Sequence, residues 1–594
     1  MSRGLSRGER AALERAHRQR YRLARPPRFQ RSPMQVPDAP PPAGAGPRVG
    51  MEKASPRRLL TLPTPPFAVR MLNHMSYGAT PESIAEFNGL GSSDVARLTA
   101  WIDRQLDPAA IDDAAVATRL TGAGYTTLGK TLAQQWSEHV RADVEYAVRM
   151  RPGWEVQREA LVRAVFSKRQ LFEVTTAFWH DHFNVMVGDY DCCPVYGHYD
   201  REVIRANAFG NFRKMLEDMA RSTAMMTYLD NKSNRRSGPN ENFARELLEL
   251  HTFGAENYLG FMDPFEVPPC PEDPDYPIGY TDIDVYETAA AFTGWSINNN
   301  HWEFTHASKD NGAFYYHADW HDSGPKFVLG RFIYPERPAL QDGRDILDRI
   351  ASHPRVAKFI CRKLARRFVA DDPPQALVDS AAAVFRANWQ APDQIKRTLR
   401  HILLSDTAQH AWGRKTRRPF EAVAATLRVL GCQWTYTFDE NRSNDLNWRL
   451  GFTGHQPYDW AAPNGYPDVS TAWSGASSFG MTWKLQNWLT ETNNVAGTGK
   501  LLPLLEITRA GLAPAQWTAN RLVEFWCRRV LGYLPTAQRL GVLRQFMAQN
   551  GDPASYVIED TNTWQQGDLK RHYNHERLRS MVSLILMSPE FLSR

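Results

Sequence analysis

Two short segments of this chain place ionisable and amide side chains among large apolar ones. The first is residues 178–184, with the sequence FWHDHFN, and the second is residues 240–251, with the sequence NENFARELLELH. Burying such groups costs free energy unless they are paired, bound to a ligand or used in chemistry. The density of His, Asp, Glu, Asn and Arg therefore predicts a polar site to which both segments contribute.

His180 and His182 are the first candidates for metal binding. In an extended segment they would project from the same face and could chelate one divalent ion together. On a helix the same spacing places them about 200° apart, and the pattern upstream of them is helical. The pair therefore predicts a chelate only if the helix stops near Trp179, and ligation by one of the two histidines stays open otherwise.

The second segment reads as an amphipathic helix. Its apolar residues fill one arc of the helical wheel, whereas its carboxylates and Arg245 fill the other. His251 falls among the leucines and Glu246 does not share its face. Two interpretations stay open: a solvated face with ion pairs at four-residue spacing, or the wall of a cleft in which Arg245 keeps the carboxylates ionised. His251 fits a hydrogen-bonded core histidine as well as a ligand.

A third segment, residues 316–322 with Lys326, supplies two imidazoles and two carboxylates from an aromatic-rich loop. Such a loop is a credible contributor to metal binding or acid–base catalysis, and it could meet the first segment in space. Residues 454–468 form a further turn-rich, aromatic loop, which either lines a ligand cleft or fastens the surface of the protein.

The leading hypothesis is a metal-dependent enzyme of the hydrolase type, in which a divalent metal activates water or polarises the substrate. The roles are metal ligands His180, His182 and His317, catalytic residues Glu246, His321 and Asp322, and substrate-binding residues Trp179, Asn242, Arg245 and Lys326. The substrate, a polymer or a small molecule, is not specified by these residues.

Two alternatives remain. In the first, Glu246 and Asp322 act as acid and base on a polysaccharide without metal, with Trp side chains as stacking platforms. In the second, the protein is a non-catalytic binding or assembly protein, and its polar motifs are internal networks that specify packing.

The elements that must position these residues are mostly helices. Apolar periodicity predicts helices that include residues 81–88, 94–105, 128–149, 156–183, 209–229, 240–252, 284–293 and 355–368, and more of them toward the end of the chain. Strands do not alternate with helices, and residues 296–332 could contain a short β-hairpin. We expect one large, mainly α domain over residues 66–594. The basic and Pro-rich residues 1–65 are expected to be a disordered tail.

Composition narrows the class of protein. The chain has 594 residues and a net charge of only +6, and it has no basic patch interleaved with aromatic residues, so we expect no nucleic-acid partner. No apolar stretch reaches the length of a membrane span. The start lacks the apolar core of a signal peptide, which predicts a cytoplasmic location.

Seven motifs together resemble one known family. They are residues 72–78, 178–184, 240–254 and 284–295, His321-Asp322 with Lys326, residues 454–468 and residues 588–592. Over this span the chain resembles the large bacterial family known as domain of unknown function 1800. The resemblance implies one mainly helical domain and a shared polar site, but no established activity. Many members carry an export signal, so the resemblance leaves export open, although the basic, Pro-rich start departs from that pattern.

Overall fold

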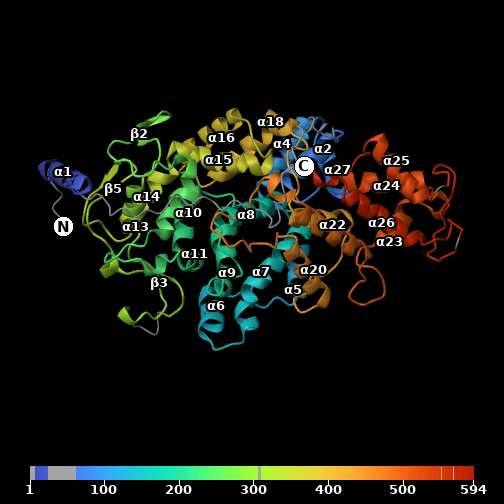
Figure 1. The fold of residues 1–594 in the computed structure, drawn as a ribbon, viewed down its shortest axis with the longest axis horizontal. Coiled ribbons are helices and arrows are strands. Elements are labelled where there is room, and N and C mark those ends of the chain that lie inside the picture. The colour runs from blue at the N-terminus through green and yellow to red at the C-terminus, as the bar shows by residue number, and fades with distance from the viewer. Residues whose placement is uncertain (1–6, 24–61, 305–309, 550, 566) are drawn as a thin grey trace, which may run out of the picture.

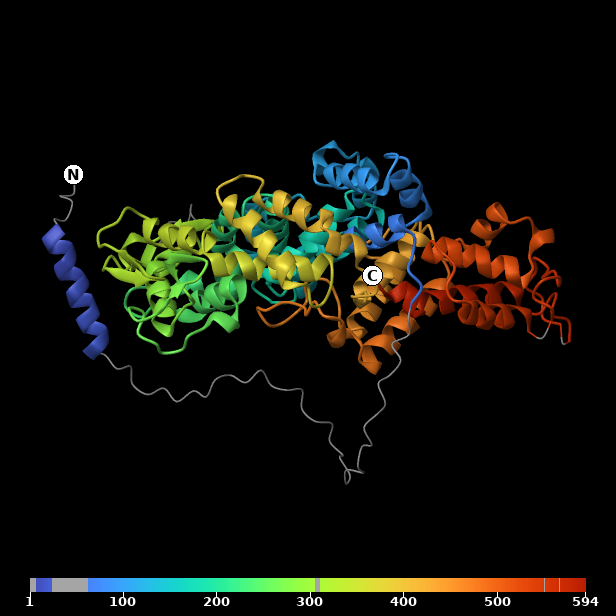
Figure 2. The same ribbon diagram turned by 90° about the horizontal axis from the view of Figure 1, so that it is seen from above.

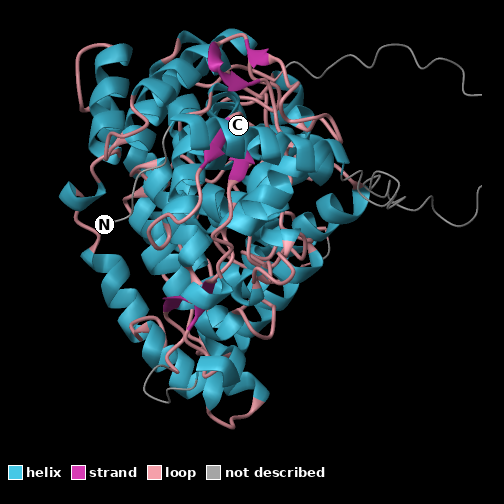
Figure 3. Cartoon of the chain, turned by 90° about the vertical axis from the view of Figure 1, so that its left-hand side faces the viewer, coloured by secondary structure: helices cyan, strands magenta, loops and turns pink. Residues whose placement is uncertain are grey.

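The computed structural model describes residues 7–23, 62–304, 310–549, 551–565 and 567–594. The structure is 58% helical, and the described residues form three small two-stranded sheets, which confirms the predicted mainly α class. Figure 3 shows how few strands interrupt the helices. One cluster of buried apolar side chains extends from Ala68 to Leu592, so the helices that contain these two residues share a core.

The molecule is elongated, and Figures 1 and 2 show it from two directions. Helices α13 and α14 with the small sheets lie toward one end, and helices α23 to α26 form the other. The helices of the first half are α1 (Arg7–Leu23), α2 (Phe67–Met75), α3 (Pro81–Asn88), α4 (Asp94–Gln105), α5 (Ala114–Gly122), α6 (Leu132–Gln135), α7 (Tyr146–Phe166), α8 (Gln170–His182), α9 (Tyr196–His198), α10 (Phe212–Arg221), α11 (Thr223–Tyr228), α12 (Glu241–Leu248) and α13 (Asp282–Ala291).

The second half continues with helices of similar length. They are α14 (Gln341–Ala351), α15 (Pro354–Phe368), α16 (Gln375–Ala387), α17 (Gln394–Leu404), α18 (Asp406–His410), α19 (Pro419–Val429), α20 (Asn441–Phe452), α21 (Ser470–Trp473), α22 (Ala476–Glu491), α23 (Leu504–Gly511), α24 (Ala519–Leu531), α25 (Ala537–Ala548), α26 (Asn574–Leu586) and α27 (Pro589–Leu592).

The three sheets are antiparallel pairs. Strand β1 (Pro269–Cys270) pairs with β2 (Asp273–Pro277), β3 (Trp295–Ile297) with β4 (Phe314–Tyr316), and β5 (Lys326–Val328) with β6 (Arg331–Ile333). The last two pairs confirm β-structure in the aromatic-rich stretch where a hairpin was considered. Both follow α13, so the loop that carries His321 is fixed at its two ends by short ladders.

Helix boundaries differ most from prediction around α7 and α8. The pattern predicted one helix over residues 156–183, but α7 starts ten residues earlier at Tyr146 and ends at Phe166. It runs through Pro152 and Gly153, which read as a break. A Cβ on Gly153 would lie 2.5 Å from the Cys193 sulfur. Glycine is therefore needed there because another segment packs directly against the helix backbone.

Residues 1–6 and 24–61 of the expected disordered tail lie outside the described residues, and residues 7–23 form helix α1. Helix α1 contacts the sheet end of the molecule: the Tyr334 hydroxyl donates to a Glu14 carboxylate oxygen at 3.0 Å, and the Arg18 guanidinium lies 4.6 Å from the Phe265 ring centroid. These contacts give a basic, polar helix a surface to pack on, which its own sequence does not reveal.

No helix among the described residues is both long and apolar enough to cross a membrane.

The loop of residues 453–469 lies across the end of α8 and is the main tertiary constraint on the first motif. The Asn184 side-chain amide donates to the carbonyls of Trp460 and Ala462, each at 2.8 Å. Gly465 has a φ of +68°, and a Cβ there would lie 1.8 Å from the Asp181 carbonyl oxygen. The loop can approach α8 this closely only because residue 465 lacks a side chain.

Substitution of Gly465 by Ala tests this close approach. Gly454 in the same loop has a similar φ of +78° but nothing within 4 Å of its Cβ position, so Gly454→Ala measures the backbone cost alone, about 1–2 kcal/mol. Gly465→Ala should destabilise by a further 1–3 kcal/mol from overpacking. Urea unfolding of both variants gives the comparison. Equal destabilisation would show that the loop does not rest on α8.

Candidate functional site

The first motif lies in the last turn of α8, which continues through His182. The helix does not stop near Trp179, so the condition for a joint chelate is not met. His180 and His182 leave the helix in different directions and have separate surroundings: tyrosine rings around His180, and phenylalanine rings with His251 around His182.

His180 belongs to a buried chain of charged groups. Its Nε2 lies 2.8 Å from an Asp200 carboxylate oxygen. The other oxygen of Asp200 accepts from Arg205 at 2.9 Å, and Arg205 also pairs with Glu173 at 2.9 Å. Burial opposes ionisation of Asp200, but Arg205 and His180 outweigh it and hold its pKa well below the usual value. The ring of Tyr458 stacks on His180 at 3.9 Å and closes the network off from solvent.

His182 joins the first motif to the second. Its Nε2 donates to the backbone carbonyl of His251 at 3.0 Å, and the two rings lie 6.1 Å apart. Both side chains are buried, and burial first, then the positive charge of Lys363, lowers their pKa values, that of His251 to about 3. His251 lies among apolar side chains, as the helical wheel predicted. Burial also lowers the pKa of Lys363, to about 8.

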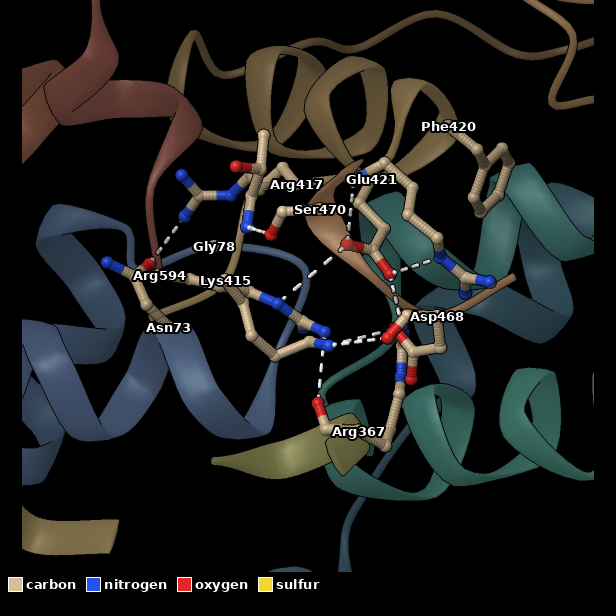
Figure 4. A network of polar contacts seen from close by, with 12 residues as sticks. Asn73, Gly78, Arg367, Lys415, Arg417, Phe420, Glu421, Asp468, Ser470 and Arg594 are labelled. Atoms are coloured by element: carbon tan, nitrogen blue, oxygen red, sulfur yellow. Dashed lines mark hydrogen bonds and ion pairs between the residues drawn. The ribbon is translucent and has the colours of Figure 1, made fainter. Parts of the chain in front are cut away.

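Asp181, between the two histidines, leads into a second buried network. Its carboxylate accepts from Arg418 at 2.6 Å. Arg418 also contacts Glu421 at 3.0 Å, and Glu421 pairs with Arg367. Figure 4 shows Glu421 and Arg367 among the residues of this network, with dashed lines for the polar contacts. Burial alone would raise the pKa of Glu421, but Arg367, Arg594 and Arg418 hold it well below the usual value.

The network continues to segments far away in the sequence. Lys415 lies 3.1 Å from an Asp468 oxygen and 3.0 Å from an Asp371 oxygen, and Arg594 donates to the Arg367 carbonyl at 3.1 Å. Four cations face four carboxylates: Arg367, Lys415, Arg418 and Arg594, with Asp181, Asp371, Glu421 and Asp468. Each of these eight groups therefore has at least one partner of opposite charge within the protein.

The three proposed metal ligands do not come together. His180 contacts Asp200, His182 contacts the His251 carbonyl, and His317 stacks on Trp320 with ring centroids 4.7 Å apart. Across the described ranges, no group of three or more His, Cys, Asp or Glu side chains could hold a metal ion. The three predicted ligands therefore do not form a site that fits the predicted divalent metal.

Trp179 is a core residue. Its side chain is fully buried, and its indole N–H donates to the Ala208 carbonyl at 3.1 Å. A substrate cannot stack on a ring enclosed in this way, so the structure gives no support to its predicted substrate-binding role.

The structure does bring three predicted residues of the third segment together. Lys326 is buried, and its ammonium group lies 2.8 Å from Asp342 and donates to the Asp322 carbonyl. His321 lies 3.3 Å from the same Asp342 carboxylate. Burial opposes the ionisation of Asp342, but His321 and Lys326 lower its pKa overall. This cluster fastens the loop to α14, and Lys326 is not accessible to a substrate.

The exposed face of α12 carries the remaining candidates. Asn242 is exposed. Arg245 pairs with Glu241 at 3.1 Å and with Asp282 at 2.9 Å, which ties α12 to the start of α13. Arg245 is thus already occupied by two carboxylates, and Glu246 is not one of them.

Glu246 is the predicted residue whose environment most resembles that of a catalytic group. It is half-buried, and it has no hydrogen bond or ion pair with any residue that the structure describes. Burial and the nearby charge of Glu249 raise its pKa to about 7. The hydroxyl of Tyr280 is buried without a hydrogen-bond partner among the described residues, and burial, then the charge of Glu249, raises its pKa above the usual value.

A short π-helical turn, Glu249–Phe253, follows α12 directly. Such turns are rare and are found frequently at functional sites. Here the wider turn starts at Glu249 and ends at Phe253, and within it His251 packs against α8. It therefore lets one side of the segment stay buried while Glu246 and Glu249 remain partly exposed.

The central partners of the buried networks were not predicted. Asp200, Arg367, Arg418, Glu421 and Asp342 each read as an ordinary surface charge in the sequence. The only signal is a run of cations, residues 414–418 with the sequence RKTRR, directly before an apolar helix. Such a run is usually solvated, so its burial could not be inferred.

Removing one partner of the central ion pair should be costly. Arg367 and Glu421 are about 1% and 3% exposed, and an unpaired buried charge typically costs 3–5 kcal/mol. Glu421→Gln should therefore destabilise by about that amount in denaturant unfolding. Asp393→Asn, in the exposed pair with Arg397, is the control and should change stability by less than about 0.5 kcal/mol. Similar effects for both would contradict a structural role for the network.

His251 should make stability depend on pH. Its folded pKa of about 3 lies below the ordinary histidine value of 6.5, so the unfolded chain binds a proton first as the pH falls below 6.5. Stability is lost in that window, by about 1 kcal/mol between pH 7.5 and 5.5 for this one group. His251→Gln should lose correspondingly less stability between these two pH values, measured by urea unfolding. His410→Gln, at an exposed histidine, should behave as the unmodified protein; the same pH dependence in all three would refute the assignment.

Comparison with known proteins places the chain in one family. A family model described as "Protein of unknown function (DUF1800)" matches residues 70–593. No curated protein and no solved structure matches the chain significantly. The match covers nearly the whole chain, including residues 178–184 and the two segments that they contact at the end of α8, residues 240–254 and 454–468. The protein therefore belongs to the DUF1800 family.

Proposed function

We propose that this protein is an acid–base enzyme of the hydrolase type, in which Glu246 carries the proton that reaches the leaving group. The observation that carries the proposal is a half-buried carboxyl with neither an ion pair nor a hydrogen bond among the described residues, beside a second carboxyl. A carboxylic acid that holds its proton near neutral pH is a typical general acid.

Glu249 is the second carboxyl of the proposed pair. It lies three residues after Glu246, so the two side chains point to the same side of the helical segment. Glu249 takes up the proton of a water molecule as that water adds to the substrate, and Glu246 gives its proton to the departing group. Water is thereby added across the cleaved bond. Each carboxyl then returns to its starting protonation state by proton exchange with solvent.

This pair replaces the predicted partnership of Glu246 with Asp322. Tyr280, Arg245 and Asp282 place Glu246 near the start of α13, whereas Asp322 hydrogen-bonds through its backbone to Thr293, just past the end of that helix. Ten helical residues rise about 15 Å, so one substrate bond cannot lie within reach of both carboxyls.

A non-catalytic role is the second candidate, and a specific observation favours it. Most charges of the motifs are satisfied inside the protein, in the networks around Glu421, Asp200 and Asp342. Such networks specify packing without chemistry. Glu246 is the residue that separates the two candidates, because a packing role does not require a carboxyl without a partner.

A substrate screen with matched variants tests the proposal. The protein is assayed against chromogenic esters, glycosides and phosphate esters from pH 5 to 9. Any turnover should fall at least a hundredfold in Glu246→Gln, the usual scale of a general acid, and should follow a pH profile with a limb near 7. Glu241→Gln changes a carboxyl on the same helix that already pairs with Arg245, and it should retain activity.

Turnover that survives in a folded Glu246→Gln variant would refute the assignment of the acid. Turnover lost equally in Glu241→Gln would show that the helix face, and not the proton on Glu246, is what matters.

A further inference from the structure

A groove between α20 and α22 lies outside all the networks described above. It has a volume of about 240 Å³ and is lined by Trp448, Arg449, Phe452, Met481, Lys484 and Leu485. An apolar cavity of about 150 Å³ is enough to hold benzene, so this groove has room for one six-membered ring of a ligand.

The walls of the groove are aromatic and open to solvent. Trp448 is 63% exposed, Phe452 is 53% exposed and the neighbouring Trp483 is 40% exposed. The rings of Trp448 and Phe452 meet nearly at right angles, 4.3 Å apart, and fix each other's orientation. Large aromatic side chains gathered in one exposed place mark binding surfaces more often than single exposed residues do.

Two cations of the groove lack anionic partners. Arg449 and Lys484 make no ion pair or hydrogen bond with any part of the chain that the structure describes, and the Arg449 guanidinium lies over the Trp488 ring at 4.8 Å. The acidic residues nearby in sequence are occupied, since Asp445 pairs with Arg442 and Glu440 caps α20. The groove therefore presents positive charge beside flat apolar faces.

We propose that this groove binds an acidic polysaccharide, with a sugar ring stacked on Trp448 and sugar carboxylates paired with Arg449 and Lys484. A sugar ring has an apolar face that packs on an aromatic ring. A uronic acid also carries a carboxylate, with which the two cations can form ion pairs. A membrane surface fits less well, because inserting aromatic side chains protrude from a protein, whereas these line a hollow. Glu246 lies on α12 and does not line this groove, so binding in the groove does not depend on the chemistry at Glu246.

Binding of polygalacturonate to the full chain is the direct test. Isothermal titration calorimetry should show binding to polygalacturonate and none to uncharged dextran. Trp448→Ala should weaken binding about tenfold, which corresponds to about 1.4 kcal/mol of stacking. Trp564→Ala, at a tryptophan that is 58% exposed outside the groove, should leave the affinity unchanged.

The contribution of charge to polysaccharide binding is tested separately, through the dependence of the affinity on salt. Lys484→Gln should weaken binding and reduce its dependence on salt, because screening acts only on the charged part of the interaction. All three variants change exposed or partly exposed side chains, and unchanged melting temperatures will verify folding.

Three results would overturn the proposal: no binding to polygalacturonate, equal binding to dextran, or unchanged affinity in Trp448→Ala. Binding of phosphatidylglycerol vesicles through Trp448 and Lys484 without binding of the polysaccharide would also overturn it, and would assign the groove to a membrane surface.

Discussion

The structure depends on a buried ionic cluster in which Glu421 is held by Arg367 and Arg418. Transfer of these charges from water is costly, and only close pairing offsets the cost. The pairing can form only when α8, α15, the start of α19 and the residues around Asp468 are all in place. The cluster therefore makes the fold of a long helical chain conditional on contacts between segments that are far apart in sequence.

This constraint changes how the motifs should be interpreted. A dense group of His, Asp and Arg in a sequence resembles an active site, yet here Asp181 and His180 each serve a buried network. Both already have partners inside the protein, so they are poor candidates for binding a metal or a substrate. The functional candidate is instead the residue that these networks leave without a partner, Glu246, together with Glu249 on the half-exposed side of the same segment.

The local sequence pattern predicted the bounds of those helices whose ends are determined by residues close in sequence. Helices α3 and α4 begin and end at the predicted residues 81–88 and 94–105, because caps and apolar spacing act within a few residues. The predicted single helix over residues 156–183 was wrong, because the backbone is extended at Ser167, where α7 ends, and α8 starts only at Gln170. The prediction that His251 lies among apolar side chains was also correct, because the face on which a helical residue lies is determined by its neighbours in sequence.

The site was predicted only in part because its partners are distant. Arg418 is 237 residues from Asp181, and Arg367 is 54 residues from Glu421. No spacing rule connects such positions, and each of these residues is of a type that is usually solvated. The sequence could show that Glu246 lies on the polar face of its helix. It could not show that Arg245 would be drawn to Asp282 and leave Glu246 without a counter-ion.

The protonation of Glu246 is the most direct test of this account. Its folded pKa of about 7 lies above the ordinary glutamate value of 4.5, so the folded protein retains a proton that the unfolded chain loses. The unmodified protein therefore loses stability as the pH rises from 4.5 to 7. Glu246→Gln removes that loss. We expect urea unfolding from pH 4 to 8.5 to show that the free energy of unfolding of the variant increases relative to that of the unmodified protein as the pH rises through this window. The expected increase is about 1–2 kcal/mol for a partly exposed group. A difference that is constant with pH, or a variant that is less stable at pH 8, would mean that Glu246 is an ordinary ionised or structural carboxylate and would contradict the account.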